Sequence, residues 1–218
     1  MRSRLNILIF IIIYFILCGK SCDDDDAQTT WQERQVTMAK DSILNEFEAD
    51  YLSEEARYAA EINAAGKLND LADYVNIYAD IALDSAFRTK AADMIRGLFD
   101  SEDDGLSFGA VSKRKMKNTT VGEFLVDGFG EGLSKVNVVF DSVRVLEPLN
   151  RSGIEAYSGR LLAYQSVICI SLTDSVLSDH QPVIVDFTSI KQEKMIGNDT
   201  LKVWAVFLTG LKPEGKSP

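Results

Sequence analysis

The amino-acid sequence predicts an α+β protein in which helices come first and a curved, cone-like antiparallel sheet of about four long strands follows. Two observations predict this order. Apolar residues recur at helical spacing in the N-terminal half, whereas beyond Ser134 they alternate with a period of two. Only four prolines are present and no low-complexity linker interrupts residues 31–212, so these residues are predicted to form one domain.

Four helical segments are predicted in the N-terminal half. Each begins near a threonine, serine or aspartate that can cap a helix, and each carries apolar residues at helical spacing. Gly66 is predicted to end the second segment, because glycine commonly follows the C-terminus of a helix. The segments cover residues 30–51, 53–65, 68–82 and 84–99.

The second half of the chain is predicted to be mostly β-structure. A short strand pair is expected within residues 106–116, and Thr120 is expected to cap a short helix over residues 121–126. Four long strands follow, around residues 136–140, 157–172, 183–187 and 201–208. The turn residues Gly197-Asn198-Asp199 favour a hairpin between the last two strands, so the strands are predicted to form an antiparallel meander.

The N-terminus has the layout of a secretory signal. Arg2 and Arg4 precede an apolar run, Leu5–Leu17, which is shorter than the roughly 20 residues that a membrane-spanning helix needs. We therefore predict that residues 1–21 are a cleaved signal peptide and that residues 22–30 form an acidic tether.

The residues around the predicted cleavage site refine this prediction. Cys22 follows the small residue Ser21 and directly precedes four aspartates, Asp23, Asp24, Asp25 and Asp26. This run resembles the surface-export signal of Bacteroidota-type lipoproteins, which implies a lipid on Cys22 and an anchor in the outer membrane at the cell surface. Two alternatives remain: a plain cleaved signal followed by a soluble acidic tail, and an uncleaved anchor.

Charge and cysteine content narrow the function classes. Removal of the signal would remove three positive charges and take the formal net charge from −10 to −13, which disfavours binding to nucleic acid. After processing, Cys169 would be the one cysteine besides the lipidated Cys22, so no intramolecular disulfide is expected. Cys169 lies in a β-prone run and is predicted to be a small buried apolar residue, not a nucleophile.

The predicted order of elements from Trp31 to Leu211 resembles the nuclear transport factor 2-like family. That resemblance implies a strongly curved sheet that wraps the helices and leaves a pocket at its open end. Enzymes of this family, such as isomerases and dehydratases, use an aspartate, histidine or tyrosine inside the cone as general acid or base. The alternative is a generic α+β sandwich with helices on one face of the sheet.

The resemblance makes three residues candidates for such a pocket. Asp186 stands between Val185 and Phe187 in a predicted strand, Tyr164 lies on a neighbouring strand, and His180 falls in a predicted loop, 179–182. No metal-binding or phosphate-binding pattern is found, and no cofactor is expected.

The sequence favours a lipid-anchored cell-envelope protein that binds a small ligand or a partner protein without turnover. One alternative is an accessory structural subunit of an outer-membrane or secretion complex. The other is an isomerase-like or dehydratase-like enzyme that uses Asp186.

Overall fold

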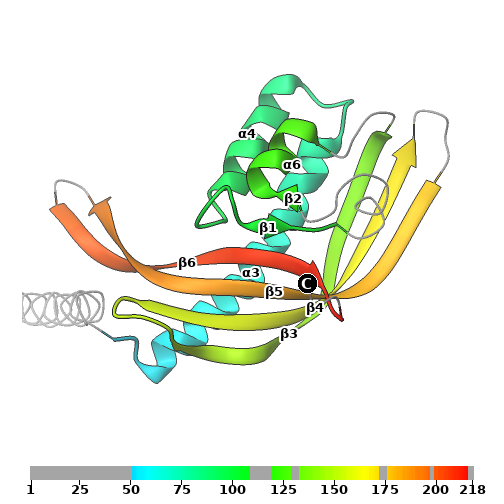
Figure 1. The fold of residues 1–218 in the computed structure, drawn as a ribbon. Coiled ribbons are helices and arrows are strands. Elements are labelled where there is room, and N and C mark those ends of the chain that lie inside the picture. Colours follow the sequence, from blue (N-terminus) through cyan, green and yellow to red (C-terminus); the bar gives the residue numbers. More distant parts are fainter. Residues whose placement is uncertain (1–50, 109–118, 129–132, 172–175, 197–198, 216–218) are drawn as a thin grey trace, which may run out of the picture. The chain divides into compact units, whose positions relative to one another are not determined.

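The computed structural model describes residues 51–108, 119–128, 133–171, 176–196 and 199–215 of the 218-residue chain. The chain divides into two units, Met1–Glu48 and Ala49–Pro218, and every described residue belongs to the second. Figure 1 shows the described elements in chain order: α3 (Glu54–Ala79), α4 (Ser85–Arg96), β1 (Gly105–Leu106), β2 (Thr119–Thr120), α6 (Val121–Asp127), β3 (Leu133–Arg151), β4 (Ala156–Ser171), β5 (Val176–Ile196) and β6 (Asp199–Pro213).

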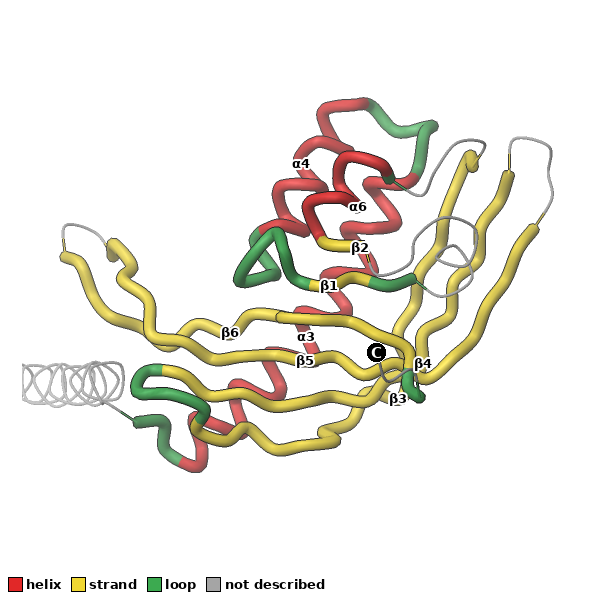
Figure 2. Tube along the Cα trace, viewed as in Figure 1, coloured by secondary structure: helices red, strands yellow, loops and turns green. Residues whose placement is uncertain are grey.

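The described strands form one six-stranded sheet in the order β2-β1-β6-β5-β4-β3. Strands β3 to β6 pair antiparallel in sequence order, which confirms the predicted meander of four long strands. The short strands β1 and β2 pair with each other, and β1 joins the sheet by a parallel contact between Gly105 and Gly210. Figure 2 shows that the long strands bend along their length. The protein is therefore a mixed α+β fold with a curved sheet.

The two faces of the sheet differ in burial. Along β4 and β5, odd-numbered side chains such as Leu161, Val185 and Phe187 are fully buried and belong to the same apolar cluster as Leu68 and Leu71 of α3. We call this the inner face. Even-numbered side chains of β4 and β5 point to the opposite, outer face, and most of them are exposed or half-buried. This alternation decides which side chains can share a site.

Helix α3 also satisfies backbone groups of β3, the last strand of the sheet. The side chain of Asn76 donates to the Val138 carbonyl oxygen at 3.0 Å and accepts from the Val138 N–H at 2.6 Å. Glu61 Oε1 accepts from the Leu149 N–H at 2.7 Å. The helix therefore supplies hydrogen bonds that a seventh strand would otherwise supply.

Replacing Asn76 with alanine is expected to lower the free energy of unfolding by about 1–3 kcal/mol, because two partly buried hydrogen bonds are lost together. Asn69→Ala is the matched control, since Asn69 is exposed on the same helix and gains the same helix propensity. Urea unfolding followed by circular dichroism measures both. Equal stability of the two variants would show that α3 does not stabilise this edge.

Three predicted helix caps are confirmed. Ser53 Oγ accepts from the Ala56 N–H, Asp84 Oδ1 accepts from the Ala86 N–H, and Thr120 forms a capping box with Glu123. Within the described residues no helix is long and apolar enough to cross a membrane. Residues 30–50 of the first predicted helix, the signal, Cys22 and the four aspartates lie outside the described residues.

The prediction that Gly66 ends a helix is wrong. Helix α3 continues through Gly66, and a side chain at this position would meet no atom within 4 Å. Ala64 and Leu68, on either side of the glycine, are both fully buried. Their packing outweighs the roughly 1 kcal/mol that glycine costs inside a helix.

The predicted loop at residues 179–182 is also wrong, because His180 lies within β5. The Pro182 carbonyl oxygen accepts from the Glu214 N–H, so the missing N–H of Pro182 points to the same side, where β6 has already ended at Pro213. A proline is tolerated there because its missing N–H lies just beyond the end of the β5–β6 ladder.

Candidate functional site

Three polar side chains lie next to one another on the inner face. Gln165 of β4 pairs directly with Gln181 of β5, and the next pair on this face joins Val167 to Asp179. Directly paired residues of antiparallel strands project to the same face, so both β5 side chains share the face of Gln165 and the buried Val167. We call Gln165, Gln181 and Asp179 the inner polar cluster.

Within the part of the chain that the structure describes, each member of the inner polar cluster has a buried polar atom without a hydrogen-bond partner. These atoms are Gln165 Oε1, Gln181 Nε2 and Asp179 Oδ2. Gln165 is 0% exposed, and its Nε2 donates to the Ser107 carbonyl oxygen at 3.4 Å. Most buried polar atoms in folded proteins are paired, and each unpaired one costs about 1–3 kcal/mol. Three such residues side by side make the inner polar cluster a candidate binding site.

Buried apolar side chains lie next to Gln165 on the inner face. Phe140 pairs with Gln165 from β3, and Val138 pairs with Val167, and all of these side chains are buried. Phe108 follows Ser107, the residue that accepts from Gln165, and its ring lies 5.3 Å from that of Phe124. A few polar groups in an apolar setting are typical of small-molecule sites.

Cys169 is buried, as predicted from the sequence. It pairs with Val136 on the inner face, one position beyond Val167 in the alternation. Burial raises the pKa of its thiol above the usual range. The thiol is therefore protonated at neutral pH and is a poor nucleophile.

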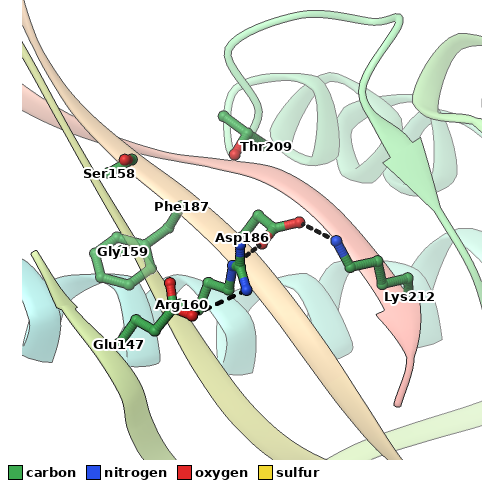
Figure 3. A pocket seen from close by; sticks show the side chains of 8 residues that line it. All are labelled: Glu147, Ser158, Gly159, Arg160, Asp186, Phe187, Thr209 and Lys212. Carbon is green, nitrogen blue, oxygen red and sulfur yellow. Dashed lines mark hydrogen bonds and ion pairs between the residues drawn. The ribbon is translucent and has the colours of Figure 1, made fainter. Parts of the chain in front are cut away.

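Asp186 lies on the outer face, where it is held by two cations. Arg160 Nε lies 3.2 Å from Asp186 Oδ1, and Lys212 Nζ lies 2.8 Å from Asp186 Oδ2. Arg160 Nη1 also binds Glu147 Oε1 at 3.0 Å, so four charged side chains form one chain of three ion pairs (Figure 3). They line a pocket of about 320 Å³, which we call the outer pocket, together with Ser158, Gly159, Phe187 and Thr209.

Tyr164 and His180 also lie on the outer face, and they contact each other. Their rings stack with centroids 5.4 Å apart and planes 13° apart, and Ser166 Oγ lies 2.7 Å from His180 Nδ1. Neither side chain lines the outer pocket around Asp186. The structure thus brings Tyr164 and His180 together, separates both from Asp186, and places all three on the face opposite to the inner polar cluster.

Sequence reasoning missed the inner polar cluster, although one signal was present. In β4 the odd-numbered positions from 157 to 169 hold apolar or small residues except at Gln165. A single glutamine in such a series marks a polar side chain on the buried face. Asp179 and Gln181 were hidden because their segment was assigned to a loop. No group of three metal-binding side chains is found among the described residues.

Comparison with known proteins finds no matching family model and no matching curated protein. A candidate aromatic ring hydroxylase from Novosphingobium aromaticivorans is 13% identical with a TM-score of 0.45, over 74% of this chain and 92% of that one. A type 2 hexachlorocyclohexane dehydrochlorinase is 8% identical with a TM-score of 0.35, over 70% and 85% of the two chains. A nuclear transport factor 2-like protein of unknown function from Exiguobacterium is 15% identical with a TM-score of 0.30, over 69% and 99%. These values assign neither a family nor an activity to this chain.

Proposed function

We propose that this chain is a lipid-anchored envelope protein that binds a small polar molecule at the inner polar cluster without converting it. The observation that carries the proposal is the set of three buried, unpaired polar atoms on Gln165, Gln181 and Asp179. A protein keeps such atoms against a cost in stability, and a bound molecule that pairs with them removes that cost.

The atoms specify the chemistry of the ligand. Gln165 Oε1 and Asp179 Oδ2 are hydrogen-bond acceptors, whereas Gln181 Nε2 is a donor. A matching ligand carries at least two donors and one acceptor close together, as a primary amide or an amino alcohol does. The buried rings of Phe108 and Phe140 favour an apolar remainder on the ligand.

Binding without turnover is supported by the side chains around the cluster. Asp179 is the one ionisable member of the cluster, and the nearby Cys169 thiol is protonated. His180 points to the outer face, where it stacks on Tyr164. General acid–base chemistry usually needs a second proton-transfer group within hydrogen-bond reach of the substrate.

One observation favours an isomerase or dehydratase as a second candidate function. It points to Asp179 as the catalytic residue instead of Asp186, which the sequence suggested. Asp186 is held by two cations on the outer face, whereas Asp179 has an unpaired carboxylate oxygen on the inner face. If the protein is an isomerase or dehydratase, Asp179 is therefore the general base. Formation of a product from a bound compound, lost in Asp179→Asn, would identify this case.

Asp179→Asn tests the binding proposal directly. Full-length protein in detergent is screened by thermal shift against small amides and amino alcohols, and the best hit is titrated by calorimetry. The substitution replaces an acceptor atom with a donor, so we expect its affinity for that hit to fall by at least about tenfold. Asp73→Asn on the exposed side of α3 is the control and should bind as the wild type does. Equal affinities of all three proteins would contradict the proposal.

The lipid anchor is tested separately, in cells. Cys22→Ser is expected to abolish incorporation of labelled palmitate and to release the protein from the membrane fraction. The proposed acyl chains are attached at this residue, and several of them are needed for firm anchoring. Cys169→Ser should still be lipidated, since Cys169 is buried. Changing Asp23, Asp24, Asp25 and Asp26 to alanine should protect the protein from protease added to intact cells. Unchanged membrane binding of Cys22→Ser would contradict lipidation at this residue.

A further inference from the structure

The outer pocket contains equal numbers of positively and negatively charged side chains. These side chains take no part in the binding proposed at the inner polar cluster. Two cations, Arg160 and Lys212, face two carboxylates, Glu147 and Asp186, across three ion pairs of 2.8–3.2 Å. The four side chains are between 30% and 54% exposed, so a solute can reach them. The pocket thus presents both signs of charge at one place with no net charge.

This balance selects against charged ligands. A bound anion would compete with Asp186 and Glu147 for the cations and would leave a carboxylate without its partner. A bound cation would do the same to Arg160 and Lys212. The acidic chain, with a formal net charge of −10, further disfavours anions.

An uncharged ligand with several hydroxyl groups fits the same groups without breaking the ion pairs. A hydroxyl donates to a carboxylate and accepts from a guanidinium or ammonium, and these cations carry more N–H donors than the three ion pairs use. Neighbouring hydroxyls of one molecule can therefore pair with Asp186 and Arg160 at once. Hydrogen bonds to charged groups are about twice as strong as neutral ones.

The side chains of Thr209 on β6 and Ser158 on β4 add two hydroxyls to the outer pocket. Asp186 pairs with Gly210 and Phe187 pairs with Leu208, so Thr209 is an extra residue in β6 without a partner on β5. Such a bulge redirects a side chain, and Thr209 lines the pocket opposite Ser158 and Arg160 (Figure 3).

An exposed aromatic side chain lies farther along the same face. Tyr164 is 40% exposed and stands four residues from Arg160 on β4, a span of about 13 Å. Its stacking against His180 holds the ring in place. The apolar C–H face of a sugar ring packs on such aromatic rings. A chain of more than one sugar unit that lies along β4 could contact both places.

We propose that the outer pocket is a second binding site, which takes an uncharged polyhydroxylated molecule of the carbohydrate class. Arg160, Asp186 and Lys212 contact the hydroxyls, with Ser158 and Thr209 at the rim. Tyr164 contacts a second unit of an oligosaccharide. This site is independent of the inner polar cluster, since the two lie on opposite faces of the sheet.

The test uses full-length protein in a detergent without a sugar head group, titrated by calorimetry with matched sugars. Glucose, cellobiose and maltose are the neutral probes, while glucuronate and glucosamine add one negative or one positive charge to the same ring. We expect at least one neutral sugar to bind at least about tenfold more tightly than both charged analogues. Tighter binding of a charged analogue, or no binding of any of these sugars, would overturn the proposal.

Variants locate the binding. Asp186→Asn removes one carboxylate and should weaken binding of the neutral sugar at least about tenfold. Glu155→Gln is the matched control, because Glu155 is a half-exposed carboxylate that pairs with Lys202 outside the pocket. Ser158→Ala removes a rim hydroxyl without disturbing an ion pair, so it should weaken binding even if Asp186→Asn unfolds the protein. Unchanged sugar affinity of a folded Asp186→Asn, or of Ser158→Ala, would also overturn the proposal.

Discussion

Replacing Phe187 with alanine is expected to lower the free energy of unfolding by about 3–5 kcal/mol. Phe187 is 0% exposed on the inner face, and it lies opposite Gly159, where strands β4 and β5 pair. Removal of the ring leaves a cavity in the middle of the sheet, which the surrounding strands can only partly fill. Chemical denaturation measures the change, and Phe87→Ala on α4 is the control because Phe87 is 67% exposed.

The same ring explains why residue 159 is glycine. A Cβ at this position would lie 2.7 Å from Cζ of Phe187, closer than carbon atoms approach in folded proteins. We therefore expect Gly159→Ala to destabilise the wild type by about 1–3 kcal/mol. In the Phe187→Ala background most of this cost should disappear, and the part that remains comes from the Glu147 carbonyl oxygen, which the Cβ would approach to 3.1 Å. Strictly additive effects would show that the ring does not fill the space over Gly159.

Replacing Gln165 with leucine should weaken ligand binding without lowering the stability of the protein. Leucine removes the unpaired Oε1 from the buried face, so we expect the free energy of unfolding to stay level or to rise by about 1 kcal/mol. The same change removes a ligand contact and should weaken binding at least about tenfold. Most substitutions at fully buried positions destabilise a protein, so a gain in stability with a loss of binding is diagnostic of a functional polar residue.

Gln192→Leu is the control for this prediction, because Gln192 is an exposed glutamine on β5. It should change neither the affinity nor, by more than about 0.5 kcal/mol, the stability. A clear loss of stability in Gln165→Leu would indicate that Gln165 is a structural residue whose hydrogen bond to Ser107 matters more than its unpaired oxygen.

Local sequence signals predicted most of the fold. Ser53, Asp84 and Thr120 cap helices as expected, and the period-two alternation located all four long strands. These features depend on neighbouring residues alone. The errors arose where tertiary contacts determine the local structure. Packing around Gly66 keeps α3 helical through a residue that usually ends helices.

The residues of the inner polar cluster were harder to predict. The period-two alternation along a strand shows which side chains share a face of the sheet. It does not show which of the two faces the helices cover. Asp186, Tyr164 and His180 therefore stood out as chemically suitable residues, although they lie on the outer face. Asp179 and Gln181 were not considered because residues 179–182 were predicted to form a loop. Whether a polar atom lacks a partner depends on distant segments such as Ser107, which no local pattern specifies.

The most direct test of the inner site is NMR of the side-chain amides during titration with the best hit of the screen. We predict that the Nε2 resonances of Gln165 and Gln181 shift with ligand concentration, whereas that of the exposed Gln192 does not. Saturable shifts of both buried amides would support binding at the inner polar cluster. Binding by calorimetry with no shift of either buried amide would contradict it.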